Sequence, residues 1–168
     1  VLSREYTECD LWRSNAIRRI KEEMPELVVL SNSAQYLKDI SPDIVQKALQ
    51  MTIDKLPSSS RKVIINDIPT SPNGNPTISL SRAKWKGRDT SSCRFRNEEP
   101  LHQQQGLINS SVSSRNANTF TISLNNQLCE DGLCRVQTEH TIIYKDQGHI
   151  TASFSRSLNN ILSQQLSR

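Results

Sequence analysis

The sequence predicts an α/β fold, a three-layer α/β/α sandwich with a parallel β-sheet at its centre. Short continuous apolar runs, typical of strands buried in a parallel sheet, alternate with longer segments of helical periodicity. The segments between these runs are long enough for the helical crossovers that parallel strands require. With 168 residues, the chain has the length of one domain, residues 1–168, that buries a single core.

The first helix and the first strand are marked by their boundaries. Apolar residues at helical spacing begin after Asp10, which is placed as an N-cap, and Pro25 ends the pattern. The run LVVLS at 27–31 then predicts a strand that is buried on both faces. The apolar face of this helix comprises Ala16, Ile17, Ile20 and Met24.

The clearest helix pattern covers residues 41–57. Ser41 is the expected N-cap, and Pro42 suits the first turn, where its backbone N–H is not needed. The run KVIIND at 62–67 predicts a second buried strand, and the Pro- and Gly-rich stretch at 68–81 predicts a loop. The buried side of the helix is expected to contain Ile44, Val45, Ala48, Leu49, Ile53 and Leu56.

The second half of the chain continues the alternation with a weaker helix pattern at 98–115. The run TFTISLN at 119–125 predicts a third strand, and TIIYKD at 141–146 predicts a short strand or an extended segment. A last helix is expected to begin near Thr151. The apolar positions of these two helices are Leu101, Ile108 and Val112 in the first, and Phe154, Leu158, Ile161, Leu162 and Leu166 in the second.

The composition is polar but well short of that of a disordered chain, with 35% apolar residues, 23% charged residues and a net charge of +4. No segment approaches the roughly 18 consecutive apolar residues of a membrane span. The first residues have neither the basic start nor the apolar stretch of a signal peptide. Because the chain also starts without Met, we expect a mature product or a fragment.

A basic cluster, RAKWKGRD at 82–89 with CRFR at 93–96, contains Trp85 and Phe95. Such a cluster can contact nucleic acid or another anion. The cluster is short, and no nucleic-acid-binding module accompanies it. A solvated loop is therefore the favoured interpretation, and no nucleic-acid partner is expected.

Two of the four cysteines are placed to form a disulfide. Cys129 and Cys134 flank the segment EDGL, whose Asp-Gly pair suits a tight turn. A metal site is the alternative, but the spacing is wrong for a zinc knuckle, and no second Cys/His pair supports it. The sequence therefore favours a disulfide, hence an oxidising compartment, and predicts no metal.

Polar side chains follow the predicted strands, beyond whose carboxyl ends functional groups of α/β proteins gather: Asn32, Asp67 and Asp146. Asp146 precedes His149 by three residues, and a carboxylate one turn away can fix the tautomer and orientation of a general base. By spacing alone, a carboxylate at a helix start beside a surface histidine is the commoner explanation. The histidines expected to be ordinary surface residues are His102 and His140.

Several blocks of the sequence resemble one enzyme family in their order and spacing. They are C..WR at Cys9, Trp12 and Arg13, PELVVLSNS at 25–33, VIINDIPTSPNGNP at 63–76, LCEDGLC at 128–134 and IIYKDQGHITASFSRSL at 142–158. Together they resemble the SGNH (GDSL-type) esterases and acyltransferases, which have a flavodoxin-like α/β/α fold. The resemblance is closest to the extracytoplasmic SGNH domain fused to the membrane-embedded acyltransferase-three domain of bacterial O-acyltransferases.

The resemblance implies roles for three residues. His149 resembles the base that deprotonates the serine nucleophile, and Asp146 resembles the residue that orients it. Asn32 lies near the block that supplies an oxyanion-hole amide, although SNSAQY lacks the Gly-x-Asn-Asp form of that block. An Asn that ends a strand is also a common turn former or helix cap. Asp67 is more consistent with a structural role.

The family's serine is absent from these blocks. That serine belongs to a Gly-Asp-Ser motif after the first strand, and none of the five glycines is followed by Asp-Ser. The resemblance therefore implies an N-terminally truncated domain that lacks the first strand, the nucleophile and the second-block glycine. Ser31 and Ser33 lie near the right region but have none of the motif's strand-turn-helix context.

The cysteine pairs that are usual in the family also imply a truncated domain. The resemblance implies an upstream partner for Cys9 that the chain does not contain, and Ser79 stands where a partner for Cys93 is expected. Cys9 and Cys93 are therefore either both free or paired with each other.

The sequence thus predicts part of an O-acyltransferase or esterase that acts on cell-envelope carbohydrate through a Ser-His-Asp triad, of which this chain carries Asp146 and His149. The partners implied are a carbohydrate substrate and a membrane acyltransferase domain, and the location implied is extracytoplasmic, periplasmic or on the cell surface. No cofactor is implied. The alternative is a catalytically inactive SGNH-fold module that binds glycan or another partner.

Overall fold

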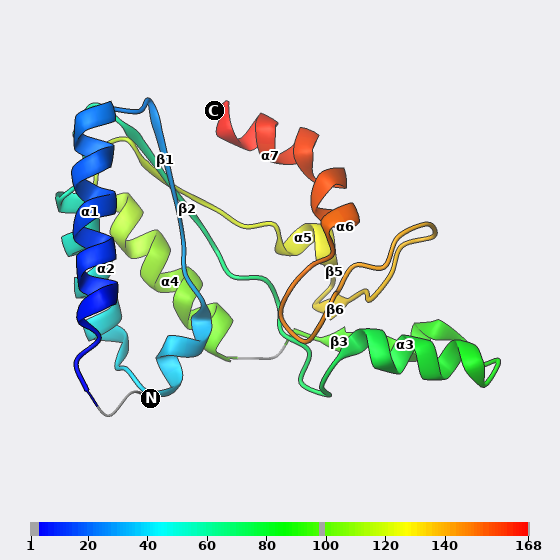
Figure 1. Cartoon of the computed structure of the whole chain (residues 1–168). Helices are drawn as coiled ribbons and strands as arrows, with labels where there is room; N and C mark the ends of the chain where they lie inside the picture. Colours follow the sequence, from blue (N-terminus) through cyan, green and yellow to red (C-terminus); the bar gives the residue numbers. More distant parts are fainter. Residues whose placement is uncertain (1–3, 98–99, 168) are drawn as a thin grey trace.

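A parallel three-stranded sheet organises the first part of the molecule. The computed structural model describes residues 4–97 and 100–167 (Figure 1). The strands β1 (Leu27–Ser31), β2 (Arg61–Ile65) and β4 (Thr119–Ile122) lie in the order β1-β2-β4, and both pairs are parallel. This arrangement confirms the predicted α/β class with a parallel sheet.

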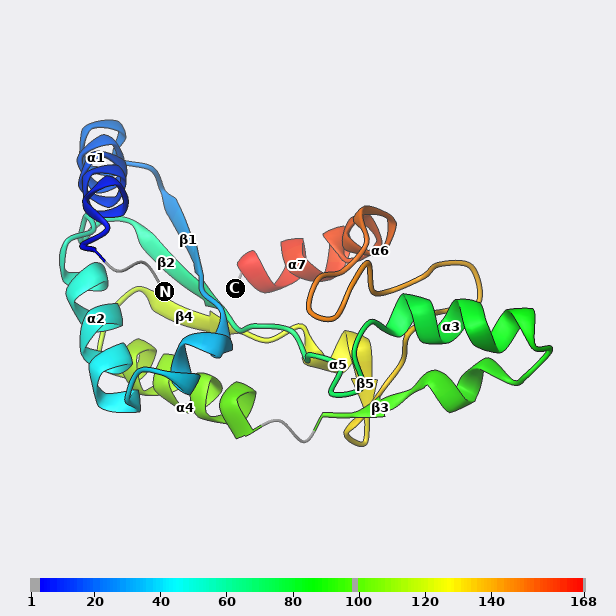
Figure 2. The same ribbon diagram turned by 60° about the horizontal axis from the view of Figure 1, so that its bottom comes forward.

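Helices α2 (Pro42–Asp54) and α4 (Pro100–Ser114) lie on the same side of this sheet (Figure 2). Their apolar side chains pack against the sheet in a cluster that we call the sheet core. Its buried residues are Val28, Ile53, Leu56, Ile64 and Val112. The helix α1 (Thr7–Glu23) adds Ile20 to this cluster. Burial of these branched side chains fixes the register, because a shift by one residue would turn them to the opposite face.

The other face of the sheet is less covered. Val29, Val63 and Phe120 are neighbours in the register and therefore share that face. Val63 is buried, whereas Val29 and Phe120 are 48% and 45% exposed. Arg61 lies over the Phe120 ring, with its guanidinium carbon 5.4 Å from the ring centroid.

A second group of elements surrounds a small antiparallel sheet of order β3-β6-β5. These elements are α3 (Pro76–Trp85), η2 (Thr90–Cys93), β3 (Phe95–Arg96), α5 (Asn125–Leu128), β5 (Cys129–Glu130), β6 (Leu133–Cys134), α6 (Ala152–Ser157) and α7 (Asn159–Leu166). They enclose a separate cluster that we call the hairpin core. Its buried residues are Leu80, Ala83, Cys93, Phe95, Leu128, Cys134, Val136, Ile143, Tyr144, Phe154 and Leu158.

The predicted boundaries of the first helix and first strand need correction. Helix α1 begins at Thr7, so Asp10 lies in its first turn rather than at the N-cap. Met24 does not pack on the apolar face: it takes a left-handed conformation at the C-cap, with φ 47°, and is exposed. Strand β1 is buried on one face only, because Val29 and Ser31 alternate with buried or half-buried residues.

Helix α2 matches the prediction at its start, where Ser41 is the N-cap and Pro42 occupies the first turn. Its buried side is narrower than predicted, since Ile44 and Ala48 are exposed. Helix α4 begins at Pro100, and the predicted start at Glu98 lies outside the described residues. The last helix begins after Thr151 as predicted, but it is interrupted at Leu158 and forms the two helices α6 and α7.

The stretch predicted as a loop at 68–81 and the basic cluster after it contain helix α3 instead. Asn75 caps this helix by accepting a hydrogen bond from the Thr77 N–H at 2.9 Å, and Pro76 follows at the first helical position. An Asn-Pro pair is a turn former in a loop, but it is also a good N-cap followed by a good first residue. The tertiary packing of Leu80 and Ala83 decides between the two.

The cysteine prediction is confirmed for one pair. Cys129 and Cys134 form a disulfide across the β5–β6 hairpin, and Asp131 and Gly132 both have positive φ, as a tight turn of this type requires. Cys9 and Cys93 are free. Ser79 does lie beside Cys93, because its hydroxyl donates a 3.5 Å hydrogen bond to Cys93 Sγ.

Among the described residues, no helix has the length and apolar character needed to cross a bilayer.

Candidate active site

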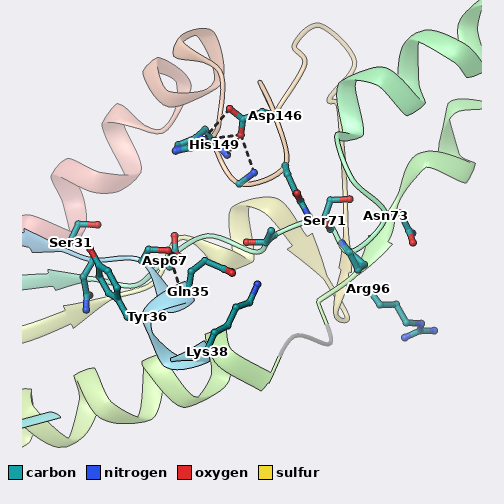
Figure 3. Close-up of a pocket in the computed structure, with 16 residues that line it drawn as sticks. Ser31, Gln35, Tyr36, Lys38, Asp67, Ser71, Asn73, Arg96, Asp146 and His149 are labelled. Atoms are coloured by element: carbon teal, nitrogen blue, oxygen red, sulfur yellow. Dashed lines mark hydrogen bonds and ion pairs between the residues drawn. The ribbon is translucent and has the colours of Figure 1, made fainter. Parts of the chain in front are cut away.

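An open cavity of about 1190 Å³ lies at the carboxyl edge of the parallel sheet (Figure 3). Three segments form most of its wall: residues 31–38 at and after the end of β1, residues 67–73 after β2, and the loop 146–149. All three predicted site residues, Asn32, Asp146 and His149, line this one cavity. Residues more than a hundred positions apart thus meet where parallel sheets usually place their functional groups.

Asp146 and His149 form a direct pair. The distances from His149 Nδ1 to the Asp146 carboxylate oxygens are 2.8 and 3.0 Å. Because a carboxylate only accepts, this contact places a proton on Nδ1 and leaves Nε2 as the basic nitrogen of the neutral ring. The His149 side chain is 80% exposed, so its ring is open to reactants in the cavity.

The same carboxylate also shapes the loop that bears the histidine. Asp146 Oδ1 accepts hydrogen bonds from the backbone N–H groups of Gly148 at 3.1 Å and His149 at 3.0 Å. These bonds favour the charged form of the acid. The hydrogen bond from the Gly148 backbone, followed by the contact with the His149 ring, lowers the pKa of Asp146 below its ordinary value.

The loop is anchored to the segment that follows β2. Ser71 N–H donates to the Gln147 carbonyl oxygen at 3.0 Å, and the Gln147 side-chain amide donates to the Ser71 carbonyl at 2.8 Å. Tyr144, which is fully buried, donates from its hydroxyl to the Pro69 carbonyl at 3.0 Å. Its ring also meets Phe95 edge-on, with 5.5 Å between centroids. These contacts fix the position of the Asp146–His149 pair relative to the parallel sheet.

The backbone of Asn32 is hydrogen-bonded to a buried glutamine. The Gln105 side-chain amide, on α4, donates to the Asn32 backbone carbonyl at 2.7 Å and approaches Asn32 Oδ1 at 3.4 Å. Because the side-chain oxygen of Asn32 faces Gln105, its NH₂ group points away from Gln105. An amide donor at the rim of this cavity has the chemistry needed to bind an oxyanion.

Asp67 has structural contacts. Its carboxylate accepts hydrogen bonds from the Ala34 N–H at 2.8 Å, the Ser33 hydroxyl at 3.2 Å and the Ile68 N–H at 3.0 Å. These bonds tie the short helix η1 (Ala34–Lys38), which follows β1, to the end of β2. From η1, Lys38 extends towards the middle of the cavity (Figure 3).

A buried polar stripe on α4 was not predicted from the sequence. Gln105 also accepts from the Asp67 N–H at 2.9 Å, so it joins the ends of β1 and β2. His102, expected at the surface, is instead buried, and its Nε2 lies 3.1 Å from the Thr70 hydroxyl. Asn109 donates to Asn66 at 2.8 Å. The spacing of these α4 residues, i, i+3 and i+7, is a helical period that polar residues can show as well as apolar ones.

Three serines line the cavity, namely Ser31, Ser33 and Ser71. In the part of the chain that the structure describes, no serine hydroxyl hydrogen-bonds to His149. Across the same residues, no three His, Cys, Asp or Glu side chains converge so as to hold a metal ion. The described part of the site therefore brings together an imidazole, the carboxylate bonded to it and an asparagine side chain.

Comparisons with known proteins show the family and the fold of the chain. The chain matches the family model of the SGNH domain (fused to AT3 domains) over residues 1–164. Among solved structures, it is similar to the lipopolysaccharide acetyltransferase periplasmic domain of Salmonella ser. Paratyphi A. A search of curated proteins found no significant match.

The similarity to the Salmonella domain has a TM-score of 0.73 and 22% sequence identity, and it shows a shared fold. It covers 92% of this chain and 62% of the Salmonella chain, so this chain spans less than two thirds of that domain. Because the family model matches nearly the whole sequence, the chain belongs to the family of SGNH domains that are fused to AT3 domains.

Proposed function

We propose that this chain supplies the base and its orienting acid for O-acyl transfer by a Ser-His-Asp triad. The observation that carries the proposal is the 2.8 Å contact between Asp146 and His149 Nδ1 at the rim of the cavity. In the proposed enzyme, the serine comes from a segment outside residues 1–168. The parent protein is then an acyltransferase or esterase with an extracytoplasmic SGNH domain.

The proposed reaction has two steps. His149 Nε2 takes the proton of the serine hydroxyl as that oxygen attacks the acyl carbonyl, and the same proton then goes to the departing alcohol. An acyl-serine remains. In the second step His149 deprotonates the acceptor hydroxyl, which attacks the acyl-serine, and the proton returns to the serine oxygen. When water replaces the acceptor, the same steps give ester hydrolysis.

Asn32 is the proposed oxyanion donor. Charge develops on the carbonyl oxygen in both tetrahedral intermediates, and a preorganised amide N–H stabilises that charge. Gln105 acts as a positioning residue in this scheme, because its bond to the Asn32 backbone restricts where the Asn32 side chain lies.

The proposed acceptor is cell-envelope carbohydrate, and the proposed acyl supply is a membrane acyltransferase domain in the same protein. Two observations support this part of the proposal: the family is that of SGNH domains fused to AT3 domains, and the similar Salmonella structure is of a lipopolysaccharide acetyltransferase periplasmic domain. An extracytoplasmic location is consistent with the Cys129–Cys134 disulfide.

Serine-directed labelling tests the function. A fluorophosphonate probe is expected to label the parent protein on one serine, and His149→Ala should lower the labelling rate at least about 100-fold, because the base is lost. The chain 1–168 alone should remain unlabelled. Rapid labelling of Ser31, Ser33 or Ser71 in this chain would overturn the proposed origin of the nucleophile. Equal labelling of the parent protein with and without His149 would overturn the role of the base.

A second candidate function is glycan binding without turnover, and the lack of a serine partner for His149 in the described residues favours it. This function predicts saturable binding of an envelope glycan with no ester formed or cleaved. Calorimetric titration of the parent protein, combined with an acyl-transfer assay, separates the two functions. Binding with full retention of acyl groups over many hours would favour this second function.

A further inference from the structure

Helix α3 exposes an apolar and basic face that the proposed reaction does not use. Leu80 and Ala83 are buried in the hairpin core, so the opposite side of the helix faces solvent. Ile78 and Trp85, seven positions apart, lie one above the other on that side, and they are 50% and 84% exposed. Arg82 and Lys86 flank them at helical spacing. We call Ile78, Arg82, Trp85 and Lys86 the α3 face.

The positive charge of the chain is concentrated around this face. Residues 82–96 contain six of the 21 Lys and Arg residues and one of the 17 Asp and Glu residues. The rest of the sequence, with 15 basic and 16 acidic residues, is close to neutral. The net charge of +4 therefore arises in one short segment rather than over the whole surface.

A second cavity, of about 420 Å³, adjoins the α3 face. Arg82, Lys86 and Arg88 line it together with Ser92. Three cations and a hydroxyl around one hollow match the charge and the hydrogen-bonding needs of a phosphate group.

The carboxyl end of α3 lies at the end of the molecule that is farthest from the parallel sheet in both views (Figures 1 and 2). Beyond it the two views show only the turn that leads from α3 to η2. A flat surface can therefore contact this end without covering the cavity that contains His149.

From these observations we infer that the α3 face docks the domain on an anionic lipid bilayer. Trp85 enters the interface between headgroups and acyl chains, where an amphipathic indole ring is favoured. The surrounding cations bind lipid phosphates, and Ile78 adds apolar area. The inference is independent of the proposed acyl-transfer chemistry, since it involves none of the residues assigned to that reaction.

An anionic bilayer explains the combination of exposed apolar and basic side chains better than a soluble polyanion does. A purely electrostatic partner would not call for an exposed Trp and an exposed Ile on the same stripe as the cations. A purely apolar partner would not account for six basic residues within 82–96. An interfacial helix needs both features on one face, because it is held by apolar insertion and by attraction to anionic headgroups.

Vesicle partitioning tests the inference with the chain 1–168. It should sediment with vesicles of phosphatidylglycerol and phosphatidylcholine in equal parts, and not with pure phosphatidylcholine. Each basic residue near an anionic surface contributes roughly fivefold in partitioning, so the double variant Arg82→Glu/Lys86→Glu should bind at least about 20-fold more weakly. Trp85→Ala should also weaken binding.

The matched control is Lys47→Glu/Lys55→Glu on α2, which makes the same change in net charge at exposed positions and, like Lys86, includes a helix C-cap residue. This control should partition within about threefold of the unmodified chain. Circular dichroism and thermal unfolding establish that both double variants are folded.

Fluorescence locates the contact. In a Trp12→Phe background, Trp85 is the sole tryptophan. Its emission should shift to the blue on anionic vesicles, since the ring leaves water. Three outcomes would overturn the inference: binding that is equal for the two double variants, an unshifted emission with vesicles bound, or a soluble anionic polysaccharide or nucleic acid that binds the α3 face more tightly than vesicles do.

Discussion

At the scale of single residues, the Asp146 carboxylate makes two kinds of hydrogen bond. It accepts backbone hydrogen bonds from Gly148 and His149, which close the loop, and it meets His149 Nδ1, which fixes the ring. The sequence pointed to this pair through the family resemblance, and both residues lie within one short segment, so their contact depends on no distant part of the chain. The contribution of Gln105 depends on tertiary contacts with residues 73 and 38 positions away, so no local pattern reveals it.

Because the Asp146 carboxylate bonds both to the loop backbone and to the His149 ring, two different substitutions can separate these two contributions. In Asp146→Asn, the new Oδ1 can still accept from the Gly148 and His149 N–H groups, so the loop should keep its shape. The amide cannot stabilise an imidazolium as a carboxylate does. We expect kcat for acyl transfer by the parent protein to fall by about 10²- to 10⁴-fold with an unchanged melting temperature.

The comparison for this variant is Asp146→Ala, which removes the loop hydrogen bonds as well and should also lower the melting temperature. Steady-state kinetics and differential scanning calorimetry provide the two readouts. An Asp146→Asn enzyme with nearly full kcat would show that the carboxylate serves the loop alone.

At the scale of elements, α4 is the part of the fold whose role was most incompletely predicted. Its apolar positions Ile108 and Val112 are buried as expected. The polar stripe of His102, Gln105 and Asn109 is buried too, although polar side chains are ordinarily assigned to solvent. The stripe is tolerated because it meets backbone and side-chain groups that the ends of β1 and β2 leave exposed.

Gln105 should therefore contribute strongly to stability. Gln105→Leu keeps the volume but leaves the Asp67 N–H and the Asn32 carbonyl without their partner in a buried site. We expect the free energy of unfolding to fall by about 2 to 4 kcal/mol in urea titrations. The control Gln103→Leu, at an exposed position of the same helix, should change it by less than about 0.5 kcal/mol. Equal effects of the two variants would remove the argument for a buried bridge.

The pairing of α3 with η2 offers a second prediction for an element. The Ser79 hydroxyl lies 3.5 Å from Cys93 Sγ, so Ser79→Cys should form a disulfide with Cys93 in air. Closing a loop of this length stabilises by about 3 kcal/mol in the chain-entropy account, and we expect a gain of about 2 to 3 kcal/mol that reductant abolishes. Mass spectrometry after alkylation reports the bond.

A Cys9→Ser background avoids competition from the other free thiol. Ser81→Cys, exposed on the same helix, is the matched control and should not become linked to Cys93. A Ser79→Cys protein with two free thiols after oxidation would show that the two elements do not hold this distance in solution.

At the scale of the whole molecule, the parallel sheet was predictable, whereas in the second group of elements only the Cys129–Cys134 turn and the start of the last helix were. LVVLS, KVIIND and TFTISLN are continuous apolar or β-branched runs, and each corresponds to a strand of the sheet. In contrast, β3, β5 and β6 have two residues each, too few to show a period. The hairpin core forms from these short pieces through contacts distant in sequence, such as those of Phe95 with Tyr144.

The two cores provide the last prediction. The sheet core and the hairpin core have no residue in common, and Cys134 is fully buried in the second. Reduction and alkylation of the Cys129–Cys134 disulfide should therefore raise amide exchange in β6, α3 and α6, while β1, β2 and β4 keep their protection. Hydrogen–deuterium exchange read by mass spectrometry resolves these segments, and the oxidised chain is the reference. A uniform loss of protection would mean instead that the two cores unfold as one cooperative unit, so that the loop carrying His149 cannot loosen without the sheet that carries Asn32.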